Sequence, residues 1–417
     1  MSDSFCEVGK PLPAWTEGTL DMHHINTGRG DSAFYVLPDG TTMLVDAGEM
    51  DPTSERVHSP RNAKARPNDS RPPHAWIADY IHQMMPDITG LDYAFLTHFH
   101  DDHLGCVTER AAESRLGPYK CTGLTGVGDI LPFGTLVDRD YPDYNYPMPI
   151  DHPRIVEAMG KNPGYQQVCG TFRNYRRFVE WQRDERGMAV EKFTPGMKDQ
   201  FVLKRSPNAF PSFEIRNICG NGVVWTGLGT TARQQFPEIE GLPLDEVPDE
   251  NPVSCGIRMR YGKFTFFNGA DIPGLPGLGK PAWWDMETPV AQVVGKVDVA
   301  VLNHHGYRDT QNEFYVRTLR PRVWIHQSWS SDQPGQDTLT RLTSTYLYPG
   351  PRDLFATEIL EATRIVFGPA IDRAYRSTRG HIVVRVLPGG EAYYVITLDD
   401  TTIERCVTGL WGPYETR

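Results

Sequence analysis

Four short apolar runs of this chain end in histidine or aspartate, and this pattern limits its possible folds more than any other feature. LDYAFLTH leads into HFHDDH at residues 98–103, and KVDVAVLNHHG ends at His304 and His305. TTMLVDAG carries Asp46, and KFTFFNGAD ends at Asp271. Compact runs rich in β-branched and aromatic residues predict buried strands. The chain therefore needs a fold that brings several strand ends to one rim.

The order of the predicted elements favours an α/β architecture. Strands are expected at 22–26, 32–38 and 41–48, the last two joined by a turn at Asp39-Gly40. Apolar residues then repeat at helical spacing over 76–84. After residue 210 strand patterns return, with hairpins over 253–271 and 381–398. Strands and helices in this order indicate sheet layers covered by helices.

A length of 417 residues allows two or three domains, or one layered unit that carries an insertion. We expect an N-terminal extension over 1–18, one domain over 19–400 and a C-terminal tail over 401–417. The segment 141–205 differs in composition from its surroundings, because it is first Pro-rich and then has a helical pattern, and it is interpreted as an insertion. Its part from 154 to 205 holds eleven Lys and Arg against six Asp and Glu. This excess predicts either a solvated helix or a lid that adds cationic groups to a substrate mouth.

Composition narrows the class of protein. A net charge of −11 gives no global attraction to nucleic acid or to anionic membranes. No run approaches the roughly 18 apolar residues of a membrane span, and MSDSFCEVGKPLPAW has no apolar core of a signal peptide, so a cytoplasmic location is expected. Seven cysteines without CxxC spacing argue against a disulfide framework and predict reduced core residues. GxGxxG, GxxxxGK[ST] and GxSxG are absent, which leaves nucleotide loops and a serine nucleophile without support.

The segment 97–105 supplies three imidazoles and two carboxylates directly after a predicted buried strand. These are the nitrogen and oxygen ligands that zinc and similar divalent ions prefer. In an extended or turning backbone His98 and His100 point the same way, because alternate residues share a face. Asp102 and His103 fall on the following turn, from which they can reach a second ion.

HFHDDH resembles the HxHxDH signature of metallo-β-lactamase-fold hydrolases. Asp46, Asp271 and the triplet His304-His305-Gly306 match the other metal-site positions of that superfamily in the expected order. GRGDSAF, LVDAG, NGAD and NHHG make the chain more similar still to the ComEC-type hydrolase domain and to phosphorylcholine esterases. The resemblance spans about residues 22–330. It implies a four-layer αββα fold, two β-sheets sandwiched by helices, with an inserted, partly helical segment.

The resemblance also implies a dinuclear site bridged by Asp271. Around it the family pattern places His98 and His100 on the first ion, and Asp102, His103 and one of His304 and His305 on the second. We favour His305 as the ligand and His304 as a group that faces substrate. Asp46 is expected to orient the cluster through hydrogen bonds, because outer partners fix ligand geometry.

Two positions depart from the family pattern. A histidine usually completes the first ion's shell before the bridging aspartate, and His152, in a Pro-rich loop, is the only histidine in that interval. His152 is therefore the expected third ligand, and Asp138 is the alternative oxygen ligand. ComEC-type sequences often have lysine before HHG, where this chain has Asn303. A nucleic acid substrate is for this reason not favoured.

Three further predictions concern residues near the motifs: the GRGDS segment, His326 and Tyr307. In GRGDS, Gly28 and Gly30 predict a tight turn with close backbone approach, in which Asp31 hydrogen-bonds locally near the metals. His326 ends a predicted strand, where it is either a satisfied buried histidine or a donor to substrate. Tyr307 follows the HHG triplet and is expected either to line the mouth or to lie on a solvated turn.

The sequence thus predicts a metal-dependent hydrolase. Two divalent ions, zinc in the first place and manganese or iron otherwise, would activate a hydroxide. The substrate is expected to be a small-molecule phosphodiester or related ester, with Asp46, Asp102 and His304 as the catalytic residues beside the ligands. If His304 is free of metal, it would protonate the leaving oxygen.

Three other functions remain open on the same residues. A lactone, thioester or amide hydrolase would use the same metal frame. It would need a more apolar mouth, for which the aromatic residues of the insertion are available, namely Tyr141, Tyr144, Tyr146, Tyr165 and Trp181. A metal-binding module without turnover and an iron-based redox protein are the other two.

Overall fold

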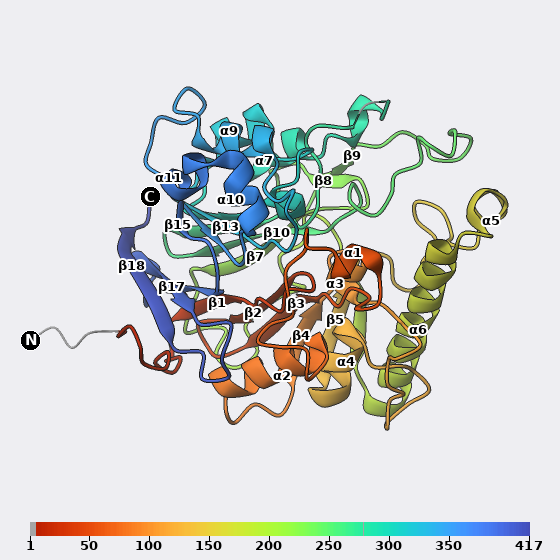
Figure 1. Cartoon of the computed structure of the whole chain (residues 1–417), viewed down its shortest axis with the longest axis horizontal. Coiled ribbons are helices and arrows are strands. Elements are labelled where there is room, and N and C mark those ends of the chain that lie inside the picture. The colour runs from red at the N-terminus through yellow and green to blue at the C-terminus, as the bar shows by residue number, and fades with distance from the viewer. Residues whose placement is uncertain (1–5, 278) are drawn as a thin grey trace, which may run out of the picture.

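A computed structural model describes residues 6–277 and 279–417 of the chain. Two mixed β-sheets pack face to face, and helices cover the outer face of each (Figure 1). Helices α2 and α4 lie outside the first sheet, while α7, α8 and α9 lie outside the second. The four-layer αββα arrangement expected from the sequence is confirmed.

The first sheet has, among the described residues, nine strands in the order β18-β17-β16-β1-β2-β3-β4-β5-β6. It is antiparallel from β18 to β3 and parallel from β3 to β6. Its strands are β1 Leu20–His24, β2 Ser32–Val36, β3 Thr42–Ala47, β4 Leu91–Phe95, β5 Phe133–Asp138, β6 Ala189–Lys192, β16 His381–Val386, β17 Ala392–Leu398 and β18 Val407–Glu415.

The second sheet is built from the later part of the chain, in the order β15-β14-β13-β12-β11-β10-β7-β8-β9. It is parallel from β11 to β15 and antiparallel from β11 to β9. Its strands are β7 Phe213–Gly220, β8 Val223–Trp225, β9 Ala232–Gln234, β10 Gly256–Tyr261, β11 Phe264–Asn268, β12 Val299–Val301, β13 Val323–His326, β14 Asp353–Ala356 and β15 Tyr375–Ser377.

Most helices connect the parallel strands, as parallel neighbours require. The helices before β7 are α1 Glu55–His58, α2 Pro73–Met84, α3 Asp101–Leu104, α4 Gly123–Ile130, α5 Pro153–Met159 and α6 Pro163–Arg186. Those after β11 are α7 Glu287–Val294, α8 Glu313–Leu319, α9 Gln336–Thr343, α10 Glu361–Phe367 and α11 Pro369–Ala374, with short 3-10 turns η1 Ala282–Trp284 and η2 Asn303–Gly306. None of the helices in the described part is long and apolar enough to cross a bilayer.

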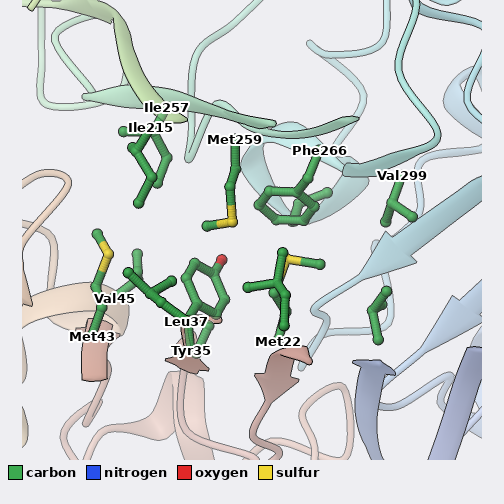
Figure 2. Close-up of a cluster of buried hydrophobic side chains, with 14 of the residues drawn as sticks. Met22, Tyr35, Leu37, Met43, Val45, Ile215, Ile257, Met259, Phe266 and Val299 are labelled. Carbon is green, nitrogen blue, oxygen red and sulfur yellow. The ribbon is translucent and has the colours of Figure 1, made fainter. Parts of the chain in front are cut away.

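The main core lies between the two sheets (Figure 2). Met22, Tyr35 and Val45 point from the first sheet toward Met259 and Phe266 of the second. All five are at most 2% exposed. Burying an apolar side chain stabilises a fold by roughly 1.5–3 kcal/mol, so this layer fixes how the two sheets face each other. The strand ends that carry the motif residues are thereby held at one rim.

Two predicted boundaries look different in the structure. The segment 401–417, expected as a tail, contains β18, which pairs with β17 along the edge of the first sheet. Its sequence VTGLWGPYE obscures the strand because glycine and proline interrupt the alternation. The segment 141–205, expected as an insertion, carries α5 and α6 and then returns as β6 parallel to β5. It is thus partly a crossover connection of the sheet.

Helix α6 ends where Gly187 adopts a left-handed conformation with φ of 71°, which glycine accepts without steric cost. Two local expectations are confirmed. All seven cysteines are free, and all but Cys406 are buried. The turn at Asp39-Gly40 joins β2 to β3.

Candidate metal centre

The end of β3 and the end of β4 bring the first part of the site together. Thr97 follows β4, and its backbone N–H and hydroxyl both donate to the Asp46 carboxylate at 2.8 Å. Asp46 itself sits in the left-handed region with φ of 58°. Helix α3 begins directly afterwards and carries Asp102 and His103 inward, where both are buried. The Asp46 carboxylate thus ties the two strand ends to the HFHDDH segment.

The glycine-rich turn before β2 braces the same segment from the other side. The Asp31 N–H donates to the Asp102 carbonyl at 2.7 Å. A Cβ at Gly30 would lie only 2.4 Å from the Asp102 carbonyl oxygen, so a side chain at residue 30 would force the two backbones apart. The tight turn predicted for GRGDS is therefore present, and it lies against helix α3.

The second part of the site follows β11 and β12. Asp271 stands just after β11, and the turn η2 after β12 carries His304 and His305. Both histidines have left-handed backbone conformations, with φ of 45° and 53°. Such conformations are costly for residues other than glycine, so the surrounding contacts must hold this turn in place.

The buried carboxylate of Glu287 on α7 holds that turn. It accepts hydrogen bonds from the Asn303 side-chain amide at 2.6 Å and from the backbone N–H groups of Gln311 and Asn312 at 2.7 Å. Glu287 is fully buried, and burial raises its pKa to about 8 although the three N–H donors favour the ionised form. Asn303 is therefore a structural residue of the turn, committed to Glu287.

Two groups of ligand-type side chains form where these parts meet. Within each group one ligand atom per residue lies within 4.8 Å of the others. The first group is His98, His100 and Asp271, and the second group is Asp102, His103, Asp271 and His305. Asp271 belongs to both, as the bridging residue of a dinuclear site would.

The shared atom is Asp271 Oδ2. It lies 3.3 Å from His103 Nε2, 3.3 Å from His305 Nε2 and 3.5 Å from His98 Nε2. His305 Nε2 is also 3.1 Å from Asp102 Oδ2. Three imidazole nitrogens from different elements thus converge on one carboxylate oxygen. Such convergence is the geometry in which nitrogen and oxygen ligands surround a divalent ion.

The two histidine ligand atoms of the second group fit a metal because they make no hydrogen bond. His103 Nε2 and His305 Nε2 are buried, and neither makes a hydrogen bond to any described residue. A buried ring nitrogen without a partner costs free energy, which coordination of an ion would offset. Imidazole nitrogens with carboxylate oxygens suit zinc, manganese or iron, so the donor set fits the ions that the sequence predicts.

The electrostatics of the cluster are strongly coupled. Burial alone would lower the pKa of His103, but the Asp271 and Asp46 carboxylates raise it well above its usual value. For His98, burial and the neighbouring His103 hold the pKa well below its usual value. Burial would raise the pKa of Asp271, but His305 and His103 lower it well below the ordinary range. Asp271 therefore stays ionised and available to cations.

Carboxylates outside the two groups lie beside two of the histidines. His103 Nδ1 donates to Asp46 Oδ2 at 2.8 Å. His305 Nδ1 lies 3.2 Å from Asp31 Oδ1. The hydrogen bond to Asp46 fixes the His103 ring with Nε2 facing Asp271, as outer carboxylates do for a ligating imidazole. Asp31 and His305, in contrast, are at ion-pair distance without a hydrogen bond. Asp46 thus lies against the ring nitrogen of His103 that points away from Asp271.

His304 stands outside both groups. Its Nδ1 lies 2.9 Å from Asp309 Oδ1, and its Nε2 lies 3.1 Å from the Asn251 side-chain nitrogen. Burial would lower the pKa of His304, but the hydrogen bond to Asp309 and the Asp271 charge raise it. Asp309 and Asn251 were missed in the sequence, because no motif marks them. A carboxylate five residues after His304 is only a weak signal.

The structure does not bring His152 or Asp138 to the cluster. His152 is the N-cap of α5, where its Nδ1 accepts from the Arg154 N–H at 3.3 Å. Asp138 accepts hydrogen bonds from the Tyr144 and Tyr175 hydroxyls and is fully buried. Neither residue belongs to the ligand groups found among the described residues. The expected third ligand of the first ion is therefore not supplied by His152 in this structure.

His326 is a satisfied buried histidine. Its Nδ1 lies 2.9 Å from the Tyr375 hydroxyl, and its Nε2 lies 2.7 Å from the His305 carbonyl. Of the two alternatives for this residue, the structure favours a role in holding the turn η2. Tyr307 lines the mouth of the site, in a cleft of about 270 Å³ that also includes Arg61 and Trp329.

No family model matches the chain, and no curated protein matches it. Among solved structures the chain is similar to a mutant of the CmlA beta-hydroxylase, with 12% identity, a TM-score of 0.36 and coverage of 90% of this chain. The chain spans 55% of that protein. It is also similar to Zn(2+)-bound PqqB from Methylobacterium extorquens, with 12% identity, a TM-score of 0.31 and coverage of 85% of this chain and 86% of that one. TM-scores below 0.5 support no inference about the reaction, so the function is argued from the site.

Proposed function

We propose that the protein is a metal-dependent hydrolase of the metallo-β-lactamase superfamily that acts on a phosphodiester or related ester. The observation that carries this proposal is the convergence of His98, His103 and His305 on one oxygen of Asp271. The order of HFHDDH, NGAD and NHHG along the chain supports the ComEC-type and phosphorylcholine-esterase branch within it.

In this proposal the two ligand groups each hold one ion and share Asp271. His98 and His100 hold the first ion, and Asp102, His103 and His305 hold the second. When bound, such ions act as Lewis acids and lower the pKa of a water from about 15.7 to near 7. Asp46 keeps His103 in the tautomer that leaves Nε2 free for coordination.

The proton donor of the proposed reaction is His304. Its ring reaches the cleft beside the ligand groups, and its side chain is 20% exposed. Asp309 accepts a hydrogen bond from Nδ1 and fixes the ring, and the Asn251 side-chain N–H donates to Nε2. For His304 to act as the donor, Nε2 must be protonated and Asn251 must turn its amide oxygen, which is buried without a partner, toward the ring. An imidazole in this position donates a proton to the leaving oxygen as the ester bond breaks.

A second candidate is a hydrolase of neutral esters, lactones or thioesters on the same residues. One observation favours it. A largely apolar cavity of about 670 Å³ adjoins the ligand groups, and His100 and Asp101 line both the cavity and the cleft. Such a cavity suits a substrate with an uncharged part.

The test is hydrolysis by chelator-stripped protein reloaded with zinc or manganese. We expect turnover of bis(p-nitrophenyl) phosphate that returns with metal and is lost in Asp271→Asn, because the shared oxygen then carries no charge. Circular dichroism of the variant controls for folding. Two bound ions per chain without turnover of this diester or of p-nitrophenyl acetate would rule out both hydrolase candidates.

A further inference from the structure

The segment 141–205 and the loop before β10 enclose a cavity of about 670 Å³ beside the metal centre. Helices α5 and α6 line it together with Phe99 and Arg139. His100 and Asp101 lie on the border, because they line this cavity as well as the metal cleft. A substrate that reaches the ligand groups can therefore extend into the cavity.

The wall of the cavity is mainly apolar. Its apolar side chains include Phe99, Tyr144, Ile150, Ile155, Val168 and Phe172. The aromatic rings pack on one another, with Phe99 and Phe172 at 5.1 Å and Tyr144 and Phe172 at 5.6 Å between centroids. These rings form a rigid floor whose contacts do not depend on a ligand.

Helices α5 and α6 also leave apolar side chains of the lining uncovered. Met159 on α5 is 44% exposed and Val168 on α6 is 53% exposed, and both line the cavity. Leaving such groups in water forgoes about 25 cal/mol per Å² of apolar surface. An apolar ligand between these side chains and the aromatic floor would recover part of that free energy.

The charges around the cavity disfavour an anionic ligand part. Five carboxylate residues line it, namely Asp51, Asp101, Asp140, Asp249 and Glu250. Among the described lining residues Arg139 is the only arginine or lysine, and Glu250 pairs with it at 2.5 Å. Carboxylates thus outnumber the cations of the lining, which disfavours a phosphate chain or a nucleotide in the cavity.

One basic side chain of 154–205 reaches a carboxylate of the lining, because Lys192 Nζ lies 3.1 Å from Asp140 Oδ1. None of the eleven basic residues of this segment lines the cavity or the metal cleft in the described part of the chain. Several are used elsewhere: Arg205 pairs with Asp92, Lys198 with Glu214, and Arg183 with Asp184. Of the two interpretations of the basic excess, the solvated surface fits the structure better than the cationic lid.

We propose that this cavity binds an uncharged apolar arm of the substrate, such as an aliphatic chain attached next to the ester bond. The inference rests on the proposed hydrolase function and specifies its substrate class. The ester group lies at the ligand groups, and the arm passes His100 and Asp101 into the cavity that Val168 and the aromatic rings line.

The first experiment compares short and long substrates of the metal-loaded chain. Methyl and octyl p-nitrophenyl phosphates form one pair, and p-nitrophenyl acetate and octanoate form the other. Each methylene group that enters the cavity should raise kcat/KM about fourfold until the space is filled. We expect the octyl or octanoyl substrate to be preferred by at least tenfold, and a ratio near one for both pairs would overturn the inference.

Two variants locate the preference. Val168→Asp places a charge in the cavity wall at an exposed position, and it should lower the long-to-short ratio by tenfold or more. Val156→Asp is the matched control, because Val156 is 46% exposed on α5 but does not line the cavity. This control should keep the ratio of the unmodified protein. Equal ratios in the two variants would contradict the assigned position.

A binding measurement separates this inference from the proposed function. The uncharged probe N-phenyl-1-naphthylamine becomes fluorescent in apolar sites, and its binding needs no hydrolysis. We expect saturable binding that Val168→Asp weakens and Val156→Asp does not. Such binding without hydrolysis of any ester would sink the proposed function but support the apolar cavity. Hydrolysis without probe binding and without chain-length preference would support the proposed function but contradict the apolar cavity as a substrate site.

Discussion

The two ligand groups that meet at Asp271 differ in how the protein supports them. In the second group a carboxylate stands behind each histidine, Asp46 behind His103 and Asp31 behind His305. In the first group no carboxylate stands behind His98 in the described part of the chain: its Nδ1 lies 3.2 Å from the Thr97 hydroxyl, and its Nε2 lies 3.2 Å from His100 Nδ1. An outer carboxylate that accepts a hydrogen bond fixes the tautomer and raises ligand basicity, so the bond from His103 to Asp46 makes the second group the better-organised half of the site.

Burial adds to this difference. All four residues of the second group are buried, whereas His100 of the first group is only half-buried and borders both the cavity and the cleft. The first group also offers three ligand residues where the second offers four. We infer that the second group binds its ion tightly and that the first group exchanges its ion with solvent more readily. Titration of the metal-free chain should show two steps of different affinity.

The largest expected effect separates the two groups directly. His305→Ala should abolish binding in the tight step and reduce hydrolysis by more than the 10- to 100-fold typical of an outer partner. His100→Ala should remove only the weak step and leave one tightly bound ion. Metal content after gel filtration, measured by atomic emission, checks both. Loss of both ions in His100→Ala would mean that the groups are not independent.

Removing the support of the second group should have a smaller effect. Asp46→Asn keeps the size of the side chain but weakens the hydrogen bond from His103 Nδ1. We expect the tight step to weaken by roughly 10- to 100-fold while the weak step is unchanged. Isothermal titration with zinc and a competing chelator measures both steps. An equal loss in both steps would show that Asp46 supports the whole rim through Thr97 instead.

A third prediction concerns the turn that carries His304 and His305. Glu287→Gln points an amide N–H at backbone donors, so we expect a loss of about 2 kcal/mol in the free energy of unfolding. Burial raises the pKa of Glu287 to about 8 from its ordinary 4.5, so the native state of the unmodified protein favours the neutral carboxyl. The Glu287 carboxyl therefore contributes to the free energy of unfolding fully below pH 4.5, and this contribution is lost as the pH rises through 8.

The stability of the unmodified protein and of Glu287→Gln, compared at different pH values, tests the direction of this pH dependence. The stability difference between the unmodified protein and Glu287→Gln should be largest near pH 5 and smaller at about pH 9, above the raised pKa. Urea unfolding at both pH values measures it, and the matched variant cancels the titration of all other groups. A difference that grows with pH would mean that the carboxylate is bound in its ionised form.

Much of this site could be predicted from the sequence because it lies where short buried strands end. His98, Asp102 and Asp271 all follow apolar runs whose period and composition are local properties of the chain. The sequence also indicated that Asp46 orients the ligands, and the structure places it against His103. The motif alone did not decide which of His304 and His305 is the metal ligand.

Other parts of the site depend on contacts between distant segments, which no local pattern records. Glu287 lies on an amphipathic helix, and its sequence context does not show that its carboxylate holds a turn. Asn251 reaches His304 from a loop with no recognisable element. For β18, glycine and proline hide a strand that only its pairing with β17 defines.

The smallest expected effect concerns His152, which the family pattern makes a metal ligand but which the structure places at the N-cap of α5. As the N-cap of a seven-residue helix with a 3.3 Å hydrogen bond, its side chain should contribute less than about 1 kcal/mol to stability. His152→Ala should therefore keep both metal-binding steps, and Asn162→Ala at the N-cap of α6 is the matched control. Zinc titration of the two variants checks this. Loss of the weak step in His152→Ala alone would mean that residues 141–153 close over the first group when the ion binds, and that the unequal support of the two groups holds only for the metal-free protein.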